Sequence, residues 1–179
     1  MLRKIAITIS LVIGTLLFSG CVTSSAPQTS TGEKIKISVL SDRGDPKKME
    51  SRQWQYRNEV GAYMERDLIN RLNRTGYDAN LITSRKEHTS GPGRYLVEVS
   101  IKSYNPGSSA ARILVGFGAG ACSLDIHYAV FGSGSKAIME WDDGIGTAGD
   151  WRRLPVALNN KLVHKLNAEL AARPQESDF

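Results

Sequence analysis

The sequence predicts an α+β domain, a two-layer α/β sandwich in which a mostly antiparallel sheet of about five strands carries two helices on one face. Two observations predict this class. Short segments alternate apolar with polar residues, which indicates a sheet with one covered and one solvated face. Two longer segments repeat apolar residues about every four positions, as amphipathic helices do. The order is strand, helix, four strands, helix (β-α-β-β-β-β-α).

The first strand and the first helix open the domain. Residues 34–40 alternate as a half-buried strand does, and the polar residues 41–53 after them predict a loop. The helix that follows is expected to end at Gly76, because glycine is favoured just past the end of a helix. Its apolar stripe consists of Val60, Met64, Leu68 and Leu72.

Two strands are expected after this helix, separated by a polar loop. The first covers residues 78–84, with Ala79 and Leu81 on one face. The second covers residues 95–104, the clearest alternation in the chain, and it ends in the turn sequence Asn-Pro-Gly.

The last two strands precede the second helix. Residues 123–131 and 136–141 alternate, with a Gly-Ser-Gly-Ser turn between them. The sequence Asp-Asp-Gly at 142–144 predicts another turn. The second helix is expected from near Pro155, since proline is favoured at a helix start, to about Ala172. Its stripe consists of Leu158, Leu162, Leu166 and Leu170.

The N-terminus has the pattern of an export signal. Arg3 and Lys4 precede an apolar run from Ile5 to Phe18, which is too short for a membrane-spanning helix. The sequence Leu-Phe-Ser-Gly-Cys ending at Cys21 resembles the lipobox, in which the cysteine sulfur is diacylated and the chain is cut before the cysteine. We therefore expect a lipoprotein signal peptide over 1–20 and a lipid such as palmitate on Cys21.

The rest of the chain divides by composition. Residues 21–33 are rich in Ser, Thr, Pro and Gln, which predicts a flexible tether that buries little. A single globular domain is expected over 34–172, followed by a polar tail over 173–179.

The charge balance is mild. The chain has 23 basic and 18 acidic residues, and removing Arg3 and Lys4 with the leader leaves 21 against 18, a net charge of +3. An exported protein without a basic stripe interleaved with aromatics is not expected to bind nucleic acid. Because Cys21 is assigned to lipid, Cys122 cannot form an internal disulfide and is interpreted as a small buried apolar residue.

Short motifs give no catalytic signature. The alternate glycines of 116–120 are followed by a strand pattern and not by the helix that a dinucleotide site needs, and residues 132–136 match a phosphate loop only in composition. Asp125 and His127 share a strand face, which suggests a weak metal pair, but a solvated face is the better interpretation. We expect no enzyme activity, no cofactor and no metal.

The segment from Arg112 to Ala121 is apolar and rich in glycine, although it joins two strands. One interpretation is that the glycines allow close backbone packing or mark bulges at a sheet edge. The other is an apolar lip that touches a membrane or a partner protein. The candidate interface residues are Arg112, Gly116, Phe117, Gly118 and Gly120.

This segment carries a family resemblance. Tyr104-Asn-Pro-Gly, followed by Arg112-Ile-Leu-Val-Gly-Phe-Gly-Ala-Gly-Ala-Cys-Ser-Leu-Asp-Ile, resembles the bacterial lipoprotein family described as domain of unknown function 4410. The resemblance covers roughly residues 34–172 and implies no established activity. Cys122 stands where that family usually has other residues, which argues against a conserved thiol role. The order of elements also resembles periplasmic domains of the lipoprotein activators of penicillin-binding proteins and of the curli secretion channel, an analogy of fold alone.

These observations predict an uncharacterised envelope lipoprotein, a non-enzymatic module for protein interaction or assembly. In a Gram-negative cell, Val22 after the lipidated cysteine implies export to the outer membrane, facing the periplasm, by resemblance to the sorting rule in which an aspartate at this position retains lipoproteins. The partners expected are the membrane, through the lipid, and another envelope protein. The alternatives are a periplasmic small-molecule or metal binder, or an accessory subunit of a secretion or polysaccharide-export machine.

Overall fold

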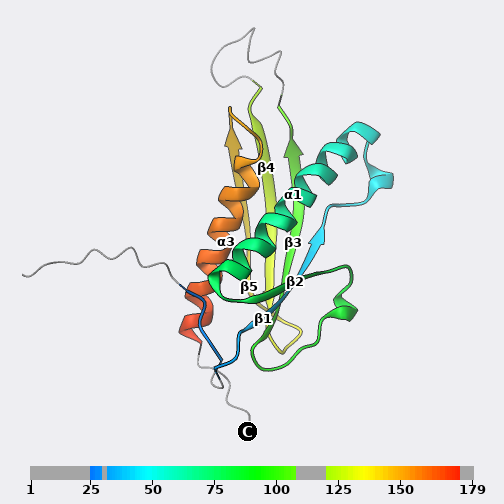
Figure 1. The fold of residues 1–179 in the computed structure, drawn as a ribbon. Helices are drawn as coiled ribbons and strands as arrows, with labels where there is room; N and C mark the ends of the chain where they lie inside the picture. Colours follow the sequence, from blue (N-terminus) through cyan, green and yellow to red (C-terminus); the bar gives the residue numbers. More distant parts are fainter. Residues whose placement is uncertain (1–24, 30–31, 108–119, 174–179) are drawn as a thin grey trace, which may run out of the picture.

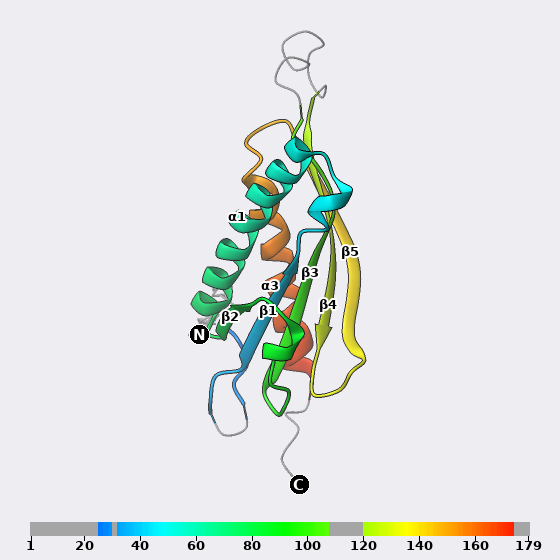
Figure 2. The same ribbon diagram turned by 90° about the vertical axis from the view of Figure 1, so that its right-hand side faces the viewer.

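The computed structural model describes residues 25–29, 32–107 and 120–173. A five-stranded sheet, in the order β2-β1-β3-β4-β5, carries helices α1 and α3 on one face (Figures 1 and 2). This confirms the two-layer α+β class and the order of elements. The elements are β1 (Lys36–Asp42), η1 (Pro46–Lys48), α1 (Ser51–Thr75), β2 (Asp78–Ile82), η2 (Arg85–Glu87), β3 (Arg94–Asn105), β4 (Cys122–Phe131), β5 (Ala137–Thr147) and α3 (Arg153–Ala172).

The sheet is mixed rather than mostly antiparallel. The pairs β3–β4 and β4–β5 are antiparallel, whereas β1 runs parallel to both of its neighbours, β2 and β3. The reason lies in the connection. Helix α1 carries the chain back along the sheet to the end at which β1 started, so that β2 begins there and runs in the same direction, as in a βαβ unit. Only the last three strands form the antiparallel meander that short turns allow.

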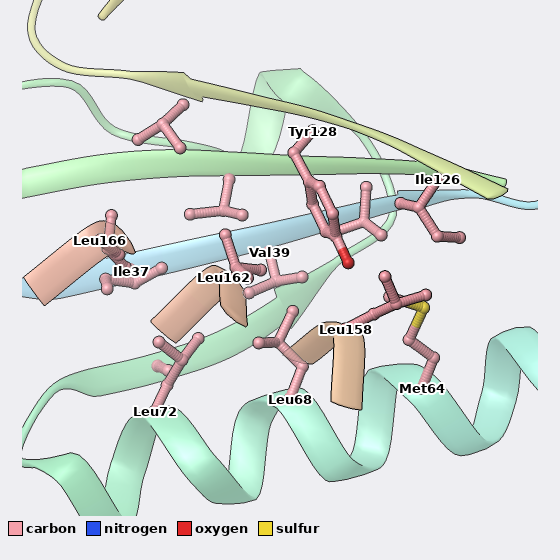
Figure 3. Packing of buried hydrophobic residues seen from close by; sticks show 14 of the residues in the cluster. Ile37, Val39, Met64, Leu68, Leu72, Ile126, Tyr128, Leu158, Leu162 and Leu166 are labelled. Atoms are coloured by element: carbon pink, nitrogen blue, oxygen red, sulfur yellow. The ribbon is translucent and has the colours of Figure 1, made fainter. Parts of the chain in front are cut away.

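The hydrophobic core lies between the helices and the inner face of the sheet, as Figure 3 shows. Both predicted apolar stripes face it and are buried, including Leu68 on α1 and Leu162 on α3. Inner-face residues of the central strands, such as Ile37, Val39 and Ile126, meet these leucines from the other side. The alternation and the helical period therefore identified the core.

Two expectations about the strands were wrong. The Asp-Asp-Gly sequence at 142–144 is not a turn but part of β5, where Asp143 accepts a 2.8 Å hydrogen bond from the Lys161 Nζ of α3 and Asp142 pairs with His127 of β4. Leu81 was expected to face the core beside Ala79, but it is 45% exposed. It lies on β2, an edge strand that is buried at only two of its five positions.

The outer face of the sheet is partly covered, although the alternation predicted a solvated face. The segment 83–93 follows the edge strand β2 and crosses to β3 and β4. Arg85 forms an ion pair with Glu98, its guanidinium lies 4.6 Å from the centre of the Phe131 ring, and His88 Nδ1 lies 3.1 Å from Ser38 Oγ. Three apolar residues outside the main core are buried in the sheet: Ile82, Leu96 and Ala129.

The N-terminal residues that the structure describes contact the domain, which differs from the expectation of a free tether. The amide of Ala26 donates a 2.9 Å hydrogen bond to the carbonyl of Thr75 at the end of α1, and its side chain packs on the core. A turn follows, in which Gly32 donates to Thr29 and Thr29 donates to Glu33. Part of the expected tether is therefore docked on the domain.

We expect Ala26→Pro to lower the free energy of unfolding by about 1 kcal/mol, because proline has no amide hydrogen to donate to the Thr75 carbonyl. Ser25→Pro is the matched control, since Ser25 is exposed. Urea unfolding of the two variants measures the difference. Equal stability of both variants and the parent would show that the docked segment contributes nothing.

Candidate interface at the hairpin neck

Most of the site residues that the sequence predicted lie outside the residues that the structure describes. These are Cys21, Arg112, Gly116, Phe117 and Gly118. Gly120 is described, and it lies where the chain returns to the sheet to begin β4. The structure therefore describes the residues that flank the predicted interface segment and the last residues of that segment.

We define the hairpin neck as residues 105–107 and 120–122, at the end of the β3–β4 pair (Figure 2). The Gly107 amide donates a 2.9 Å hydrogen bond to Asn105 Oδ1, and Cys122 Sγ donates to the carbonyl of Pro106 at the same distance. Gly107 and Gly120 have φ values of 72° and 73°, which favour glycine. A Cβ on Gly107 would overlap the Gly120 carbonyl oxygen, so the two arms touch backbone to backbone.

Cys122 is buried, which confirms the interpretation of a small core residue. Its hydrogen bond to Pro106 ties the start of β4 to the other arm of the neck. The residue thus supports the shape of the neck, a role that burial alone did not predict.

Arg57 holds the strand that leads to the neck. It is buried on α1, and its guanidinium donates hydrogen bonds to the carbonyl oxygens of Ile101 and Lys102 at the β-bulge in β3. Burial lowers the pKa of Arg57, while the nearby Asp42 acts in the opposite direction. Sequence reasoning missed this residue, but a signal exists. Arg57 continues the apolar stripe of α1 three positions before Val60, where a charge needs a buried partner.

Aromatic side chains lie on the elements that reach the neck end of the domain: the end of β3, the first half of α1 and the connection from β5 to α3. Tyr104 lies near the end of β3, and burial is the main cause that raises the pKa of Tyr104 to about 12. Tyr56 of α1 lies close enough to add a smaller electrostatic contribution in the same direction. Trp151 follows the end of β5, where Thr147 pairs with Cys122, and its ring meets that of Tyr63 edge to face with centroids 5.5 Å apart. We call Tyr56, Tyr63, Tyr104 and Trp151 the aromatic rim. All are at least partly exposed, Tyr56 to 37%.

The strand face with the suspected metal pair is arranged differently from the expectation. Asp125 accepts a hydrogen bond from Ser103, whereas His127 lies between two other carboxylates. His127 Nδ1 is 2.8 Å from Asp142, and Nε2 is 3.1 Å from Glu140. Over residues 25–29, 32–107 and 120–173, no group of three or more His, Cys, Asp or Glu side chains could hold a metal ion.

None of the helices in the described part of the chain is long and apolar enough to span a membrane.

Comparison with known proteins gives a family and several distantly similar solved structures, two of which are given below. The family model described as "Domain of unknown function (DUF4410)" matches residues 27–145, whereas no curated protein matches. The structure of a PelC dodecamer from Paraburkholderia phytofirmans is similar at 15% identity and a TM-score of 0.40, covering 84% of this chain and 95% of that one. A putative neuraminyllactose-binding hemagglutinin homolog from Helicobacter pylori is similar at 11% identity and a TM-score of 0.27, covering 83% and 90%.

Proposed function

The chain belongs to the family described as domain of unknown function DUF4410, and from this premise we propose that it is an envelope lipoprotein whose domain binds another envelope protein through the neck end. The lipid on Cys21 anchors it, and in a Gram-negative cell Val22 directs it to the outer membrane. The protein is a binding module and not an enzyme.

The observation that carries the proposal is the aromatic rim at the neck end of the domain. Tyrosine and tryptophan are enriched at the energetic centres of protein interfaces, because they offer a large apolar area and a polar group at low entropic cost. Here Tyr56 remains 37% exposed, and the neck includes Gly120 and Ala121, the last two residues of the apolar glycine segment. The bulge bonded by Arg57 and the contact of Gly107 with Gly120 hold this surface in a defined geometry.

Cys21→Ser is expected to abolish lipidation, because the sulfur that receives the lipid is lost. The variant should remain an uncleaved precursor and should not incorporate labelled palmitate in growing cells. Cys122→Ser is the matched control and should label normally, since Cys122 is buried in the domain. Normal labelling of the Cys21 variant would contradict the lipoprotein proposal.

A photoreactive amino acid in place of Tyr56 is expected to cross-link the full-length chain to a discrete partner in intact cells. The same residue at Leu81, which is also exposed but lies on the edge strand β2, is the matched control. Phe117→Ala should weaken the Tyr56 cross-link without lowering stability if the glycine segment is part of the interface. Equal cross-linking at both positions would contradict a partner surface at the neck, and a loss of about 3–5 kcal/mol in Phe117→Ala would instead assign that ring to the core.

The narrower alternative is an accessory subunit of a secretion or polysaccharide-export machine. In this alternative the protein binds through the same surface, but its partner is part of a large complex. Native electrophoresis of gently solubilised membranes separates the two roles, since the subunit would migrate with a complex that the Tyr56 cross-link also enters. The small-molecule or metal binder stays a prediction from sequence.

A further inference from the structure

The docked N-terminal segment fixes where a lipid anchor would join the domain. Ala26 is bonded to Thr75 at the C-terminal end of α1, in the half of the domain away from the neck (Figures 1 and 2). Cys21 precedes Ala26 by five residues, and an extended chain of that length spans at most about 18 Å. A lipid on Cys21 therefore keeps this part of the domain close to the membrane surface.

The neck lies far from this attachment point. Helix α1 starts near the neck end and ends at Thr75, and its 25 residues correspond to a length of about 37 Å. This length exceeds the reach of the chain between Cys21 and Ala26. The domain can therefore stand with the neck directed away from the lipid surface.

Basic side chains gather at the end of the domain opposite the neck. The start of β1 and the residues just before it, the start of β3, the turn between β4 and β5, and the last turn of α1 lie at this end (Figure 1). We call this set the anchor pole: Lys34, Lys36, Arg74, Arg94 and Lys136. Arg94 is half-buried and the other four are exposed.

The charges of the anchor pole are available for a ligand. Among the described residues, none of the five forms an ion pair within 4.0 Å, whereas basic residues elsewhere, such as Arg43 and Arg71, are paired with carboxylates. Exposed acidic residues at the same end are Glu33 and Asp78, the latter in register with Lys36. The positive charge exceeds the negative charge at this pole.

We propose that the anchor pole rests on anionic phospholipid headgroups and thereby holds the neck away from the membrane. The inference rests on the proposed lipid anchor, which brings the pole to the surface. Lysine and arginine side chains near an anionic bilayer are attracted by its negative surface potential, within about one Debye length, roughly 8 Å at physiological salt. The lipid supplies attachment, and the pole supplies orientation.

The test uses the full chain, purified from membranes and reconstituted into vesicles that carry a short-range fluorescence quencher on the headgroups. A fluorophore is attached to a cysteine introduced by Ser135→Cys, at the anchor pole, or by Glu50→Cys, at the start of α1. With phosphatidylglycerol in the vesicles, we expect the probe at 135 to be quenched several-fold more strongly than the probe at 50. Pure phosphatidylcholine, or salt of about 1 M, should reduce this difference.

A charge-neutral variant tests the named residues. The combination of Lys34→Gln, Lys36→Gln, Arg74→Gln and Lys136→Gln should lower the quenching at 135 in phosphatidylglycerol vesicles to the level seen in phosphatidylcholine. The control removes the same charge from exposed residues elsewhere, by Lys47→Gln, Lys48→Gln, Arg52→Gln and Lys102→Gln, and should keep the difference.

Two results would overturn the inference. Equal quenching of both probes would mean that the domain lies on its side, and quenching at 135 that does not depend on phosphatidylglycerol would mean that the charges do not recognise lipid. Failure of the lipid anchor itself looks different. The parent chain would then not float with vesicles, and a thiol reagent would label Cys21.

Discussion

Leu162→Ala and Leu68→Ala are each expected to lower the free energy of unfolding by about 2–5 kcal/mol. Leu162 is 0% exposed and Leu68 1% exposed, and they lie in the middle of their helices, facing the sheet (Figure 3). Truncation would remove apolar contacts and leave a cavity that the rigid strands cannot fill. Chemical unfolding monitored by circular dichroism measures the loss.

Leu81→Ala is the matched control for these substitutions. The same atoms are removed, but Leu81 is 45% exposed on β2, so we expect a loss below about 1 kcal/mol. A comparable loss at all three leucines would mean that burial in the structure does not determine their contribution. A loss below about 1 kcal/mol at Leu68 or Leu162 would place that helix at the periphery.

Gly107→Ala is expected to destabilise the neck, with a loss of about 2–4 kcal/mol in the free energy of unfolding. Two costs combine. The φ value of 72° is strained for alanine, and the new Cβ would overlap the Gly120 carbonyl oxygen and lie 3.0 Å from the carbonyl carbon of Ala121. Neither neighbour is a flexible side chain, so the arms of the neck have to separate.

Gly134→Ala provides the control for this substitution. Gly134 lies in the turn between β4 and β5, and no heavy atom would come within 4 Å of a Cβ there. We expect no measurable loss of stability. If the neck is the partner surface, Gly107→Ala should also weaken the Tyr56 cross-link while Gly134→Ala leaves it intact. Parent-like stability and cross-linking of Gly107→Ala would show that the close approach of the arms is not required.

Periodicity predicted the core, the two helices and the layer arrangement, because the spacing of apolar residues directly reflects which side of a helix or strand is buried. The stripe through Leu68 and the stripe through Leu162 are both buried. Strand alternation, in contrast, does not reveal strand direction. The parallel pairing of β1 with both neighbours depends on where the chain re-enters the sheet, which alternation does not encode.

The other differences arise from contacts between distant segments. Asp142 and Asp143 lie within a strand because His127 and Lys161 pair with them, and local turn propensity could not show these partners. Three further features also depend on contacts between segments far apart in the chain. They are the hydrogen bonds of Arg57 to β3, the segment 83–93 that covers part of the outer face, and the docking of Ala26 on α1. The predicted interface segment itself, with Phe117 at its centre, stays a prediction.

The position of β1 between β2 and β3 has a consequence for how the molecule folds. Strands β2 and β3 follow each other in the chain but do not pair, because β1 separates them in the sheet. The β3–β4–β5 meander can form from segments that are neighbours in the chain. In contrast, β1 becomes hydrogen-bonded on both edges only after β3 has paired with the edge of β1 that faces away from β2. We therefore expect folding to start in the C-terminal half, with the unit of β1, α1 and β2 docking last, an order that amide hydrogen exchange during refolding can follow.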